Sequence, residues 1–179
     1  MKKHLLRSSK FLSLVLRHDP AAIALQLDPQ GWADVAEVLS GLAAAGHPLS
    51  PEELEEIVAT NEKKRFVIEG GRIRAQQGHS IDIELGLEPV VPPEVLFHGS
   101  AERNRASILQ KGLHAAARQH VHLSHEADTA RQVGSRHGRP LIFLVASGAM
   151  HRAGHAFYRS GNGVWLCDRV PPEFIQVEA

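Results

Sequence analysis

Hydrophobic residues near the start of the chain recur at the spacing of a helix. In residues 8–18 the apolar side chains fall three and four positions apart, which places them on one helical face. Pro20 disfavours helical geometry in the residue before it, so we predict that this helix ends near His18. Arg17 and His18 would then lie at its C-terminal end, where the helix dipole favours positive charge.

Two further helices are predicted by periodic apolar residues that follow recognisable caps. Residues 32–46 repeat the helical spacing, with Asp34 as the predicted N-cap and a glycine at the end of the pattern. Residues 50–60 begin with Ser50 and a proline, and Glu53 stands three positions after the cap, as in a capping box. These signals predict helices that begin close to Asp34 and Ser50.

A β-hairpin is predicted at residues 65–75, where two strand-like runs meet at Gly70 and Gly71. Glycine adopts the positive φ angles that a tight two-residue turn requires. Three helices followed by a hairpin are typical of a winged-helix module, which serves nucleic-acid binding, protein interaction or purely structural roles. The second and third helices carry few cations, so the basic edge would be the hairpin and the end of the first helix.

The second half of the chain consists mainly of short β-like runs. Three prolines within residues 89–93 predict a linker. The strand-like runs are residues 95–99, 121–124, 140–146, 156–160, 163–167 and 174–178, and only residues 104–112 and 125–137 look helical. We therefore predict an α+β protein with two lobes, residues 1–88 and 94–179. The excess of strands argues against a doubly wound nucleotide-binding fold.

The composition is that of a globular protein, and it does not indicate a binding partner. The chain has 179 residues, 43% of them hydrophobic, and a formal net charge of zero, so any anion site must come from local clustering. Cys167 is the one cysteine, and its apolar surroundings predict a buried small side chain rather than a nucleophile. The first residues resemble neither a signal peptide nor a membrane span, so we expect a cytoplasmic protein with no membrane partner.

The 12 histidines require a test for a metal site. The closest spacings are those of His120, His122 and His125, and of His151 and His155. Without a second cysteine or an HExxH pattern, a closed zinc site would need four ligands from scattered histidines and carboxylates. We therefore expect no metal.

Three local features are polar where a core would be apolar. They are Arg17-His18 at a helix end, the hairpin cations that begin at Arg65, and the alternating Arg118, His120 and His122. A strand over the third feature would direct its polar side chains to one face, with Val121 and Leu123 behind. Each feature can equally be solvated surface.

Together the three features suggest a phosphate site, because arginine holds phosphate bidentately and histidine moves protons near neutral pH. The substrate's phosphate could itself be the nucleophile, since no Ser-His-Asp or Cys-His set is evident.

Eight stretches occur in a characteristic order between residue 12 and about residue 171: LSLVLRHDP, GW, KKRFVIEGGRIRAQQGHSI, LFHGS, ILQKGL, RQHVHLS, GRP and FYRSGNGVWLCDRVP. In sequence and order they resemble the RNA 2′-phosphotransferases, which use NAD+ to remove a splice-junction 2′-phosphate from tRNA. Two positions depart from the family pattern, since Ser100 replaces the usual threonine and Gln76 stands where asparagine is expected.

The resemblance implies a winged-helix-like N-terminal lobe that binds the RNA phosphate and an ADP-ribosyltransferase-like C-terminal lobe that binds NAD+. It also implies a reaction in two steps. The RNA 2′-phosphate attacks the nicotinamide ribose and expels nicotinamide, and the 2″-hydroxyl of the attached ADP-ribose then attacks the phosphorus. The products are RNA with a 2′-hydroxyl and ADP-ribose 1″,2″-cyclic phosphate.

The resemblance further implies which residues form the site. The family's Arg-His-Arg-Arg set falls on Arg17, His18, Arg65 and Arg118. Its arginines would clamp the phosphate, and its histidine would orient a group or move a proton. The expected NAD+ contacts are His98, Gly99, Ser100, His122, Ser124, Ser160, Asn162, Gly163 and Val164. Arg74 and His79 are expected to help bind the RNA.

Two other activities stay open at this point. An ADP-ribosyltransferase that modifies another acceptor, such as a terminal nucleic-acid phosphate, would leave ADP-ribose attached to its product. A winged-helix regulator that only senses NAD+ would bind the dinucleotide without consuming it.

Overall fold

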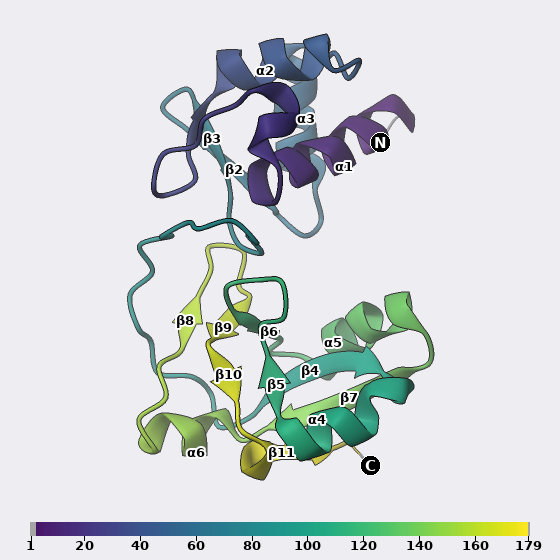
Figure 1. The fold of residues 1–179 in the computed structure, drawn as a ribbon, viewed down its shortest axis with the longest axis vertical. Coiled ribbons are helices and arrows are strands. Elements are labelled where there is room, and N and C mark those ends of the chain that lie inside the picture. Colours follow the sequence, from purple (N-terminus) through teal and green to yellow (C-terminus); the bar gives the residue numbers. More distant parts are fainter. Residues whose placement is uncertain (1–2, 179) are drawn as a thin grey trace. The chain divides into compact units, whose positions relative to one another are not determined.

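The computed structural model describes residues 3–178, and the chain forms two compact units that divide between Gly86 and Leu87 (Figure 1). Both units combine helices with small antiparallel sheets, which confirms the predicted α+β class. Each unit has a hydrophobic core of its own. No helix within the described residues is long and apolar enough to cross a membrane.

The first unit begins with helix α1, Lys3–Arg17, and a short 3-10 helix η1, Pro20–Ile23. Helix α1 starts five residues before the predicted segment, because residues 3–7 are helical as well. Its apolar stripe enters the core of the first unit, where Leu5, Leu12 and Leu16 are fully buried. The helix ends at Arg17, as the following Asp19-Pro20 step predicts.

Helices α2, Val35–Ala44, and α3, Pro51–Thr60, begin at the predicted caps. The Asp34 carboxylate accepts hydrogen bonds from the backbone N–H groups of Ala36 and Glu37, at 2.8 and 3.2 Å. Ser50 and Glu53 form both bonds of the capping box, at 3.2 and 3.1 Å. Such caps satisfy backbone donors that the first helical turn leaves unpaired, so local sequence fixes both starts.

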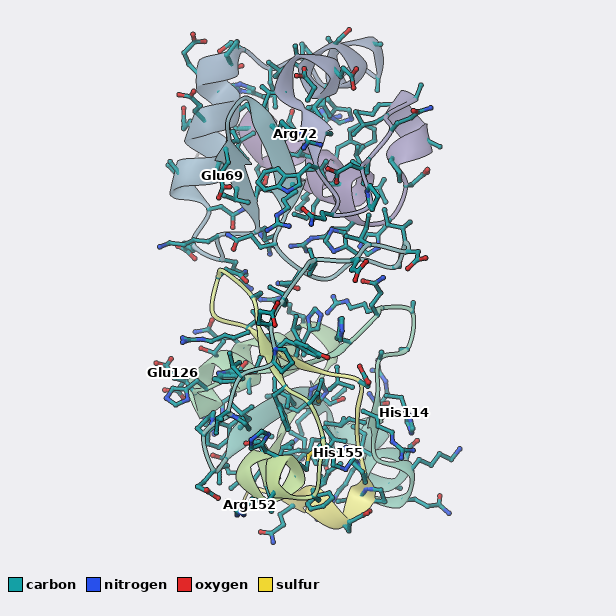
Figure 2. The ribbon with its side chains drawn as sticks, turned by 90° about the vertical axis from the view of Figure 1, so that its left-hand side faces the viewer. Glu69, Arg72, His114, Glu126, Arg152 and His155 are labelled. Atoms are coloured by element: carbon teal, nitrogen blue, oxygen red, sulfur yellow. The ribbon has the colours of Figure 1, made fainter. Side chains whose placement is uncertain are left out.

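The sheet of the first unit contains β1, Ala33–Asp34, β2, Phe66–Glu69, and β3, Arg72–Ala75, in the order β1-β3-β2. The predicted hairpin is confirmed, with Gly70 and Gly71 at φ angles of 54° and 76°. Glu69 and Arg72 are paired in register at the two sides of this turn, and Figure 2 labels both.

The second unit contains three small antiparallel sheets. The first has the order β11-β7-β4 and consists of β4, Leu96–Ala101, β7, Pro140–Val145, and β11, Ile175–Val177. The second has the order β6-β9-β8, with β6, Val121–Leu123, β8, Tyr158–Arg159, and β9, Trp165–Cys167. The third pairs β5, Leu113–His114, with β10, Arg169–Val170. A bridge between Phe97 and Ser124 joins β4 to the end of β6.

Helices α4, Arg105–Lys111, and α5, Ala127–Gly134, match the two helices predicted in the second unit. The expectation of only two helices was wrong, because α6 spans Ser147–Arg152. Short 3-10 helices also occur, namely η2, Glu102–Asn104, η3, Ser135–His137, and η4, Pro172–Phe174. Contacts distant in sequence hold α6, since the Ser147 hydroxyl donates to the Pro93 carbonyl oxygen over 2.7 Å. A six-residue helix of this kind has too little periodicity to be recognised from sequence.

Candidate functional site

The end of α1 carries the first two candidate residues. Arg17 is the last residue of the helix, and only 8% of its surface is exposed. His18 follows and is exposed, and its Nδ1 lies 2.8 Å from the hydroxyl oxygen of Ser80. The N–H of Ser80 donates to the carbonyl oxygen of Arg17 over 3.0 Å. Ser80 therefore contacts both candidate residues, one through its backbone and the other through its side chain.

His79 lies beside this pair and is buried, with 2% of its surface exposed. Burial first, and then the positive charges of Arg17, His18 and Arg74, lower the pKa of His79 to about 4. At neutral pH the ring is therefore uncharged. Among the residues that the structure describes, neither ring nitrogen of His79 has a hydrogen-bond partner. The charged groups that act on this histidine are all cations, so the region favours a bound anion.

Arg74 belongs to the same cluster but also has structural contacts. Its guanidinium stacks over the Trp32 ring at 4.5 Å from the ring centroid. Its Nη1 donates to the carbonyl oxygens of Gln30 and Leu85 over 3.4 and 3.5 Å. These contacts tie β3 to the coil that follows it, so Arg74 helps to hold His79 and its neighbours in place.

The remaining hairpin cations do not form one cluster. Arg72 pairs with Asp28 across 2.7 Å, next to the hairpin turn. Arg65 lies just before β2 and is half-buried, with its Nη1 3.5 Å from Oδ1 of Asn61. The carbonyl oxygen of Arg65 accepts a hydrogen bond from the N–H of Gln76 over 2.9 Å. Pairing with the strand that leads to His79 therefore fixes the backbone of Arg65.

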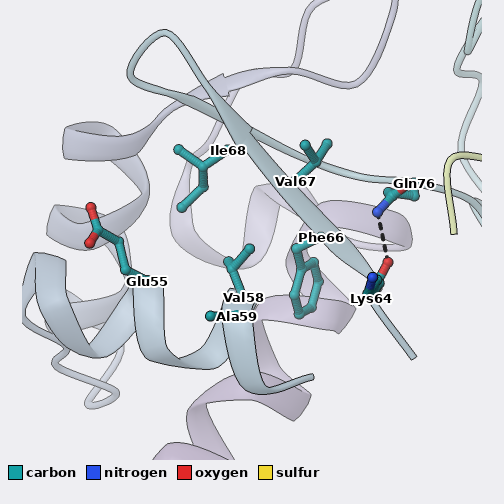
Figure 3. A pocket seen from close by; sticks show the side chains of 8 residues that line it. All are labelled: Glu55, Val58, Ala59, Lys64, Phe66, Val67, Ile68 and Gln76. Carbon is teal, nitrogen blue, oxygen red and sulfur yellow. Dashed lines mark hydrogen bonds between the residues drawn. The ribbon is translucent and has the colours of Figure 1, made fainter. Parts of the chain in front are cut away.

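A separate hollow lies between α3 and β2 in the first unit (Figure 3). It is lined by Glu55, Val58, Ala59, Lys64, Phe66, Val67, Ile68 and Gln76. The side-chain amide of Gln76 donates to the carbonyl oxygen of Lys64 over 2.8 Å at one end of this hollow. The lining is mostly apolar and contains none of the sequence-predicted site residues, so the hollow is not the anion site.

In the second unit, three candidate residues form a chain of hydrogen bonds. His98 on β4 donates from Nδ1 to the carbonyl oxygen of His122 over 3.0 Å. Arg118 donates from Nη1 to Nδ1 of His122 over 3.0 Å. Burial lowers the pKa of His98, and its hydrogen bond to His122 offsets only part of this effect. At neutral pH the Nε2 of His98 is therefore an acceptor, while His122 keeps its proton on Nε2.

The expected position of Arg118 on a strand was wrong. Strand β6 covers only Val121–Leu123, and the N–H of Arg118 donates to the Ala115 carbonyl oxygen in the preceding turn. Arg118 is exposed as a residue, yet partial enclosure of its guanidinium lowers the pKa. Val121 and Leu123 are buried behind His122 as predicted. Arg118 therefore reaches His122 from the turn before β6, and not from a neighbouring position on the same strand.

Gly99 has a packing role in addition to the predicted NAD+ contact. It lies on β4, against which α5 packs. A Cβ atom at Gly99 would overlap the carbonyl oxygen of Ala130 on α5. Gly134, at the end of the same helix, is restricted less severely, because its Cβ would lie 2.9 Å from the Ser100 carbonyl oxygen. The absence of these side chains allows α5 to approach the strand that carries His98.

The predicted serines and the glycine-rich segment are held by local hydrogen bonds. Ser100 accepts a hydrogen bond from the Asn104 side-chain amide over 3.0 Å. Ser124 exchanges backbone hydrogen bonds with Phe97, both 2.8 Å long, which places the end of β6 beside β4.

Residues 160–164 form a turn closed by the buried Ser160. Its hydroxyl lies 2.7 Å from Oδ1 of Asn162 and accepts a hydrogen bond from the N–H of Val164 over 3.1 Å. Gly163 adopts a φ angle of 82°, which other residues rarely adopt. Hydrogen bonds within residues 160–164 therefore hold the turn together.

Cys167 is buried, and burial raises the pKa of its thiol to about 12, so it is inert packing as predicted. Of the five histidines considered as metal ligands, His120 instead packs edge-on against the Tyr158 ring, and His155 does so against Phe174. Among the described side chains, no three His, Cys, Asp or Glu residues form a group that could hold a metal ion.

Comparison with known proteins gives the family. A family model described as RNA 2′-phosphotransferase, Tpt1 / KptA family, matches residues 3–169. The chain belongs to this family. A protein named probable RNA 2′-phosphotransferase from Hahella chejuensis is 54% identical over 179 residues, covering 99% of this chain and 96% of the relative. Proteins of the same name from Nostoc punctiforme and Agrobacterium fabrum are 49% and 51% identical, each over 174 residues. Both alignments cover 96% of this chain, and they cover 96% and 94% of the relatives.

Within this family member, sequence reasoning missed Ser80 and Asn104 as polar contacts of candidate residues. Ser80 directly follows His79 in the quoted stretch that contains GHS, but nothing in that stretch predicts its contact with a residue 62 positions away. Asn104 stands four residues after Ser100, beyond the end of a strand, where no periodicity relates the two.

Proposed function

We propose that the chain is an NAD-dependent RNA 2′-phosphotransferase that acts on RNA with an internal 2′-phosphate, such as a tRNA splice junction. The reaction would proceed through an ADP-ribosylated RNA phosphate and release nicotinamide and ADP-ribose 1″,2″-cyclic phosphate. The observation that carries this proposal is the buried His79 near the end of α1, whose pKa is lowered by three cations, within a chain of this family. We further propose a cytoplasmic location and a reaction that needs no metal.

The first unit is proposed to be a winged-helix-like module that binds the RNA phosphate. Its elements follow one another as α1, β1, α2, α3 and the hairpin β2-β3, and this order supports the assignment. Arg17 and His18 would contact the 2′-phosphate, and Arg65 would add a second guanidinium. Because Arg17 is largely desolvated, its attraction for a phosphate is stronger than that of an exposed arginine.

Two further residues of the first unit would bind the RNA less directly. His79 is uncharged near neutral pH and would offer a neutral N–H to a phosphate oxygen. Arg74 would mainly hold the cluster in place, since it is already stacked on Trp32 and bonded to two carbonyl oxygens. Single-stranded or junction RNA suits this site better than a long duplex, because an internal 2′-phosphate must reach buried groups.

The second unit is proposed to be an ADP-ribosyltransferase-like module that binds NAD+. Its polar groups suit a dinucleotide, because they combine an imidazole acceptor on His98 with donors on His122 and Arg118. Ser100, Ser124 and the closed turn at residues 160–164 would supply further contacts to ribose hydroxyls and to the carboxamide. When bound, NAD+ would supply the electrophilic ribose carbon.

Arg118 is the candidate catalytic arginine of the second unit. In the second step, negative charge builds on the oxygens around the phosphorus, and guanidinium groups stabilise that charge. The hydrogen bond from Arg118 to Nδ1 of His122 fixes the direction of its planar group. A fixed donor needs no reorganisation during the reaction, which is the physical source of such stabilisation.

The test is to incubate the full chain with NAD+ and a short RNA that bears one internal 2′-phosphate, and to analyse the products by mass spectrometry. We expect the RNA to lose its phosphate while nicotinamide and ADP-ribose 1″,2″-cyclic phosphate appear. ADP-ribose retained on the RNA, or on a terminal phosphate of a control RNA, would point to the transferase activity instead. Intact NAD+ in every reaction would contradict the proposal.

A further inference from the structure

We propose that the side-chain amide of Gln76 positions Arg65 by fixing the peptide unit that precedes this arginine. The inference rests on the proposed function, in which Arg65 contacts the RNA 2′-phosphate, and it deepens that function. Gln76 is a positioning residue in this proposal, because it touches no reacting atom and acts only through Arg65.

Gln76 holds both of the peptide units that flank Arg65. Its backbone N–H donates to the Arg65 carbonyl oxygen over 2.9 Å, which fixes the peptide unit after Arg65. Its side-chain Nε2 donates to the Lys64 carbonyl oxygen over 2.8 Å, which fixes the peptide unit before Arg65 (Figure 3). The backbone bond can form with any residue except proline at position 76, whereas the second bond needs this side chain. Together the two bonds set the backbone angles of Arg65, and with them the direction of its Cα–Cβ bond.

The chemistry of the side-chain bond has only one possible direction. A backbone carbonyl oxygen only accepts hydrogen bonds, so the amide of Gln76 must present its NH₂ group to Lys64. A methionine at position 76 has a similar length but no donor, and a glutamate would turn a negative oxygen toward the carbonyl. Both substitutions therefore remove this bond and leave the backbone N–H of residue 76 in place.

The peptide unit before Arg65 needs such a partner, because the residue in front of it has an unfavourable backbone conformation. Lys64 has a φ angle of 39°, in the left-handed region that a lysine rarely adopts. Its N–H donates to the Asn61 carbonyl oxygen over 2.7 Å, which closes a tight turn. Oδ1 of Asn61 also lies 3.5 Å from Nη1 of Arg65. Asn61 therefore holds the start of this turn, and the Gln76 amide holds its exit into β2.

The direction of the Arg65 side chain matters because a phosphate is bound by directed hydrogen bonds. Arg65 is half-buried, and its planar guanidinium holds a phosphate bidentately only when the plane is aimed at the phosphate oxygens. The guanidinium lies at the end of a long side chain, so a small rotation of the Cα–Cβ bond moves it over a larger distance. A misplacement of about 1 Å in a reacting complex can slow a reaction by about 10²-fold.

The first test compares the wild type with Gln76→Met and Gln76→Glu in the full chain. The matched controls are Gln77→Met and Gln77→Glu, because Gln77 is also half-buried and its side chain makes no hydrogen bond with the described residues. The ¹⁵N NMR order parameter of the Arg65 backbone amide reports how firmly the preceding peptide unit is held. We expect about 0.85 in the wild type and both controls, and a fall towards about 0.6 in Q76M and Q76E. A wild-type order parameter in Q76M would overturn the proposal.

The second test asks whether Gln76 acts through Arg65, and it measures removal of the RNA 2′-phosphate in single turnovers at saturating NAD+. We expect Q76M to slow this step about fivefold, the effect of one lost hydrogen bond, and Q77M to stay within about twofold of the wild type. In an Arg65→Ala background, Q76M should slow the step by less than about twofold, because the group that it positions is already absent.

The outcomes separate positioning from a general structural role. An equal slowing by Q76M in both backgrounds would mean that Gln76 only stabilises the fold, and it would overturn the proposal. If the wild type itself removes no phosphate, the proposed function fails, and the order parameter of the Arg65 amide then decides whether Gln76 positions Arg65.

Discussion

In the first unit the charged groups around His79 are all cations, whereas in the second unit Arg118, His122 and His98 satisfy one another through hydrogen bonds. Like charges gathered in a partly buried place repel one another, and a bound anion relieves that repulsion. A chain of paired donors and acceptors gains little from an anion but holds its members in fixed directions.

This difference fits the two ligands of the proposed function. A group of cations gathered around a buried histidine is suited to capture a phosphate, which carries the opposite charge. A preorganised polar chain is suited to orient a ligand such as NAD+, whose reacting ribose is recognised by its shape and hydroxyl groups. The proposed division therefore makes separate predictions for the two units.

The largest effect is expected from Arg17→Ala, which removes a desolvated guanidinium from the cationic cluster. Loss of one such group from a charge-stabilising site slows a reaction by about 10² to 10³-fold. We expect removal of the RNA 2′-phosphate to slow by this factor while the affinity for NAD+ is unchanged. The matched control is Arg7→Ala, since Arg7 is an exposed arginine on the same helix. If R17A weakened NAD+ binding as much as it slowed removal of the RNA 2′-phosphate, the proposal that the two units bind different ligands would be contradicted.

Gly99→Ala should destabilise the second unit strongly, because the added methyl group meets the Ala130 carbonyl oxygen. We expect the free energy of unfolding to fall by about 3 kcal/mol or more, as overpacking against backbone atoms does. Urea unfolding followed by circular dichroism measures the loss. The control is Gly154→Ala, where φ is 95° but no atom lies within 4 Å, so only about 1 kcal/mol of backbone strain is expected. Equal losses in the two variants would contradict the packing role.

His79 should make the first unit less stable at acid pH. Its pKa falls from 6.5 to about 4 on folding, so the unfolded chain takes up more protons between those pH values. The stability is complete above about pH 6.5, and up to roughly 3 kcal/mol is lost as the pH approaches 4. Urea unfolding, followed by Trp32 fluorescence in a Trp165→Phe background, measures this loss near pH 7.5 and near pH 4.5. His79→Gln should lose less than its parent, and an equal pH dependence of both proteins would contradict the account.

The smallest effect concerns His98→Ala in the second unit. Removal of its acceptor should raise the KM for NAD+ about tenfold, the typical effect of one lost hydrogen bond to a buried group. The affinity for 2′-phosphorylated RNA should stay the same. His114→Ala is the control, because His114 is an exposed histidine of the same unit (Figure 2). Among the described residues, its ring is hydrogen-bonded to the Lys111 carbonyl oxygen. Weaker RNA binding by H98A would show that the two ligands share this residue.

The elements that the sequence predicts well are those with local signals. The caps at Asp34 and Ser50 and the Gly70-Gly71 turn each depend on residues within a few positions of one another. Their structures follow from backbone groups that the same segment satisfies. The two-residue strands β1, β5 and β10 and helix α6 depend on partners far along the chain, so no periodicity in their own residues predicted them.

In the candidate site too, only the features that depend on local sequence could be predicted. Residues of the first helix end and of β4 were placed from their own segments, and their elements are confirmed. The predicted strand position of Arg118 failed because alternation describes a strand only where a ladder partner exists, and here β9 pairs with just three residues of β6. The contact between Ser80 and His18 spans 62 positions, so only the folded chain reveals it.

The role of the cations at the end of α1 is best measured by the affinity of the full chain, without NAD+, for two RNAs that differ only in one internal 2′-phosphate. We expect the wild type and H98A to prefer the phosphorylated RNA by about tenfold or more, as charge-assisted hydrogen bonds to one phosphate provide. We expect R17A to lose this preference while R7A keeps it. A preference that survives intact in R17A would contradict the claim that the cationic cluster at the end of α1 receives the phosphate.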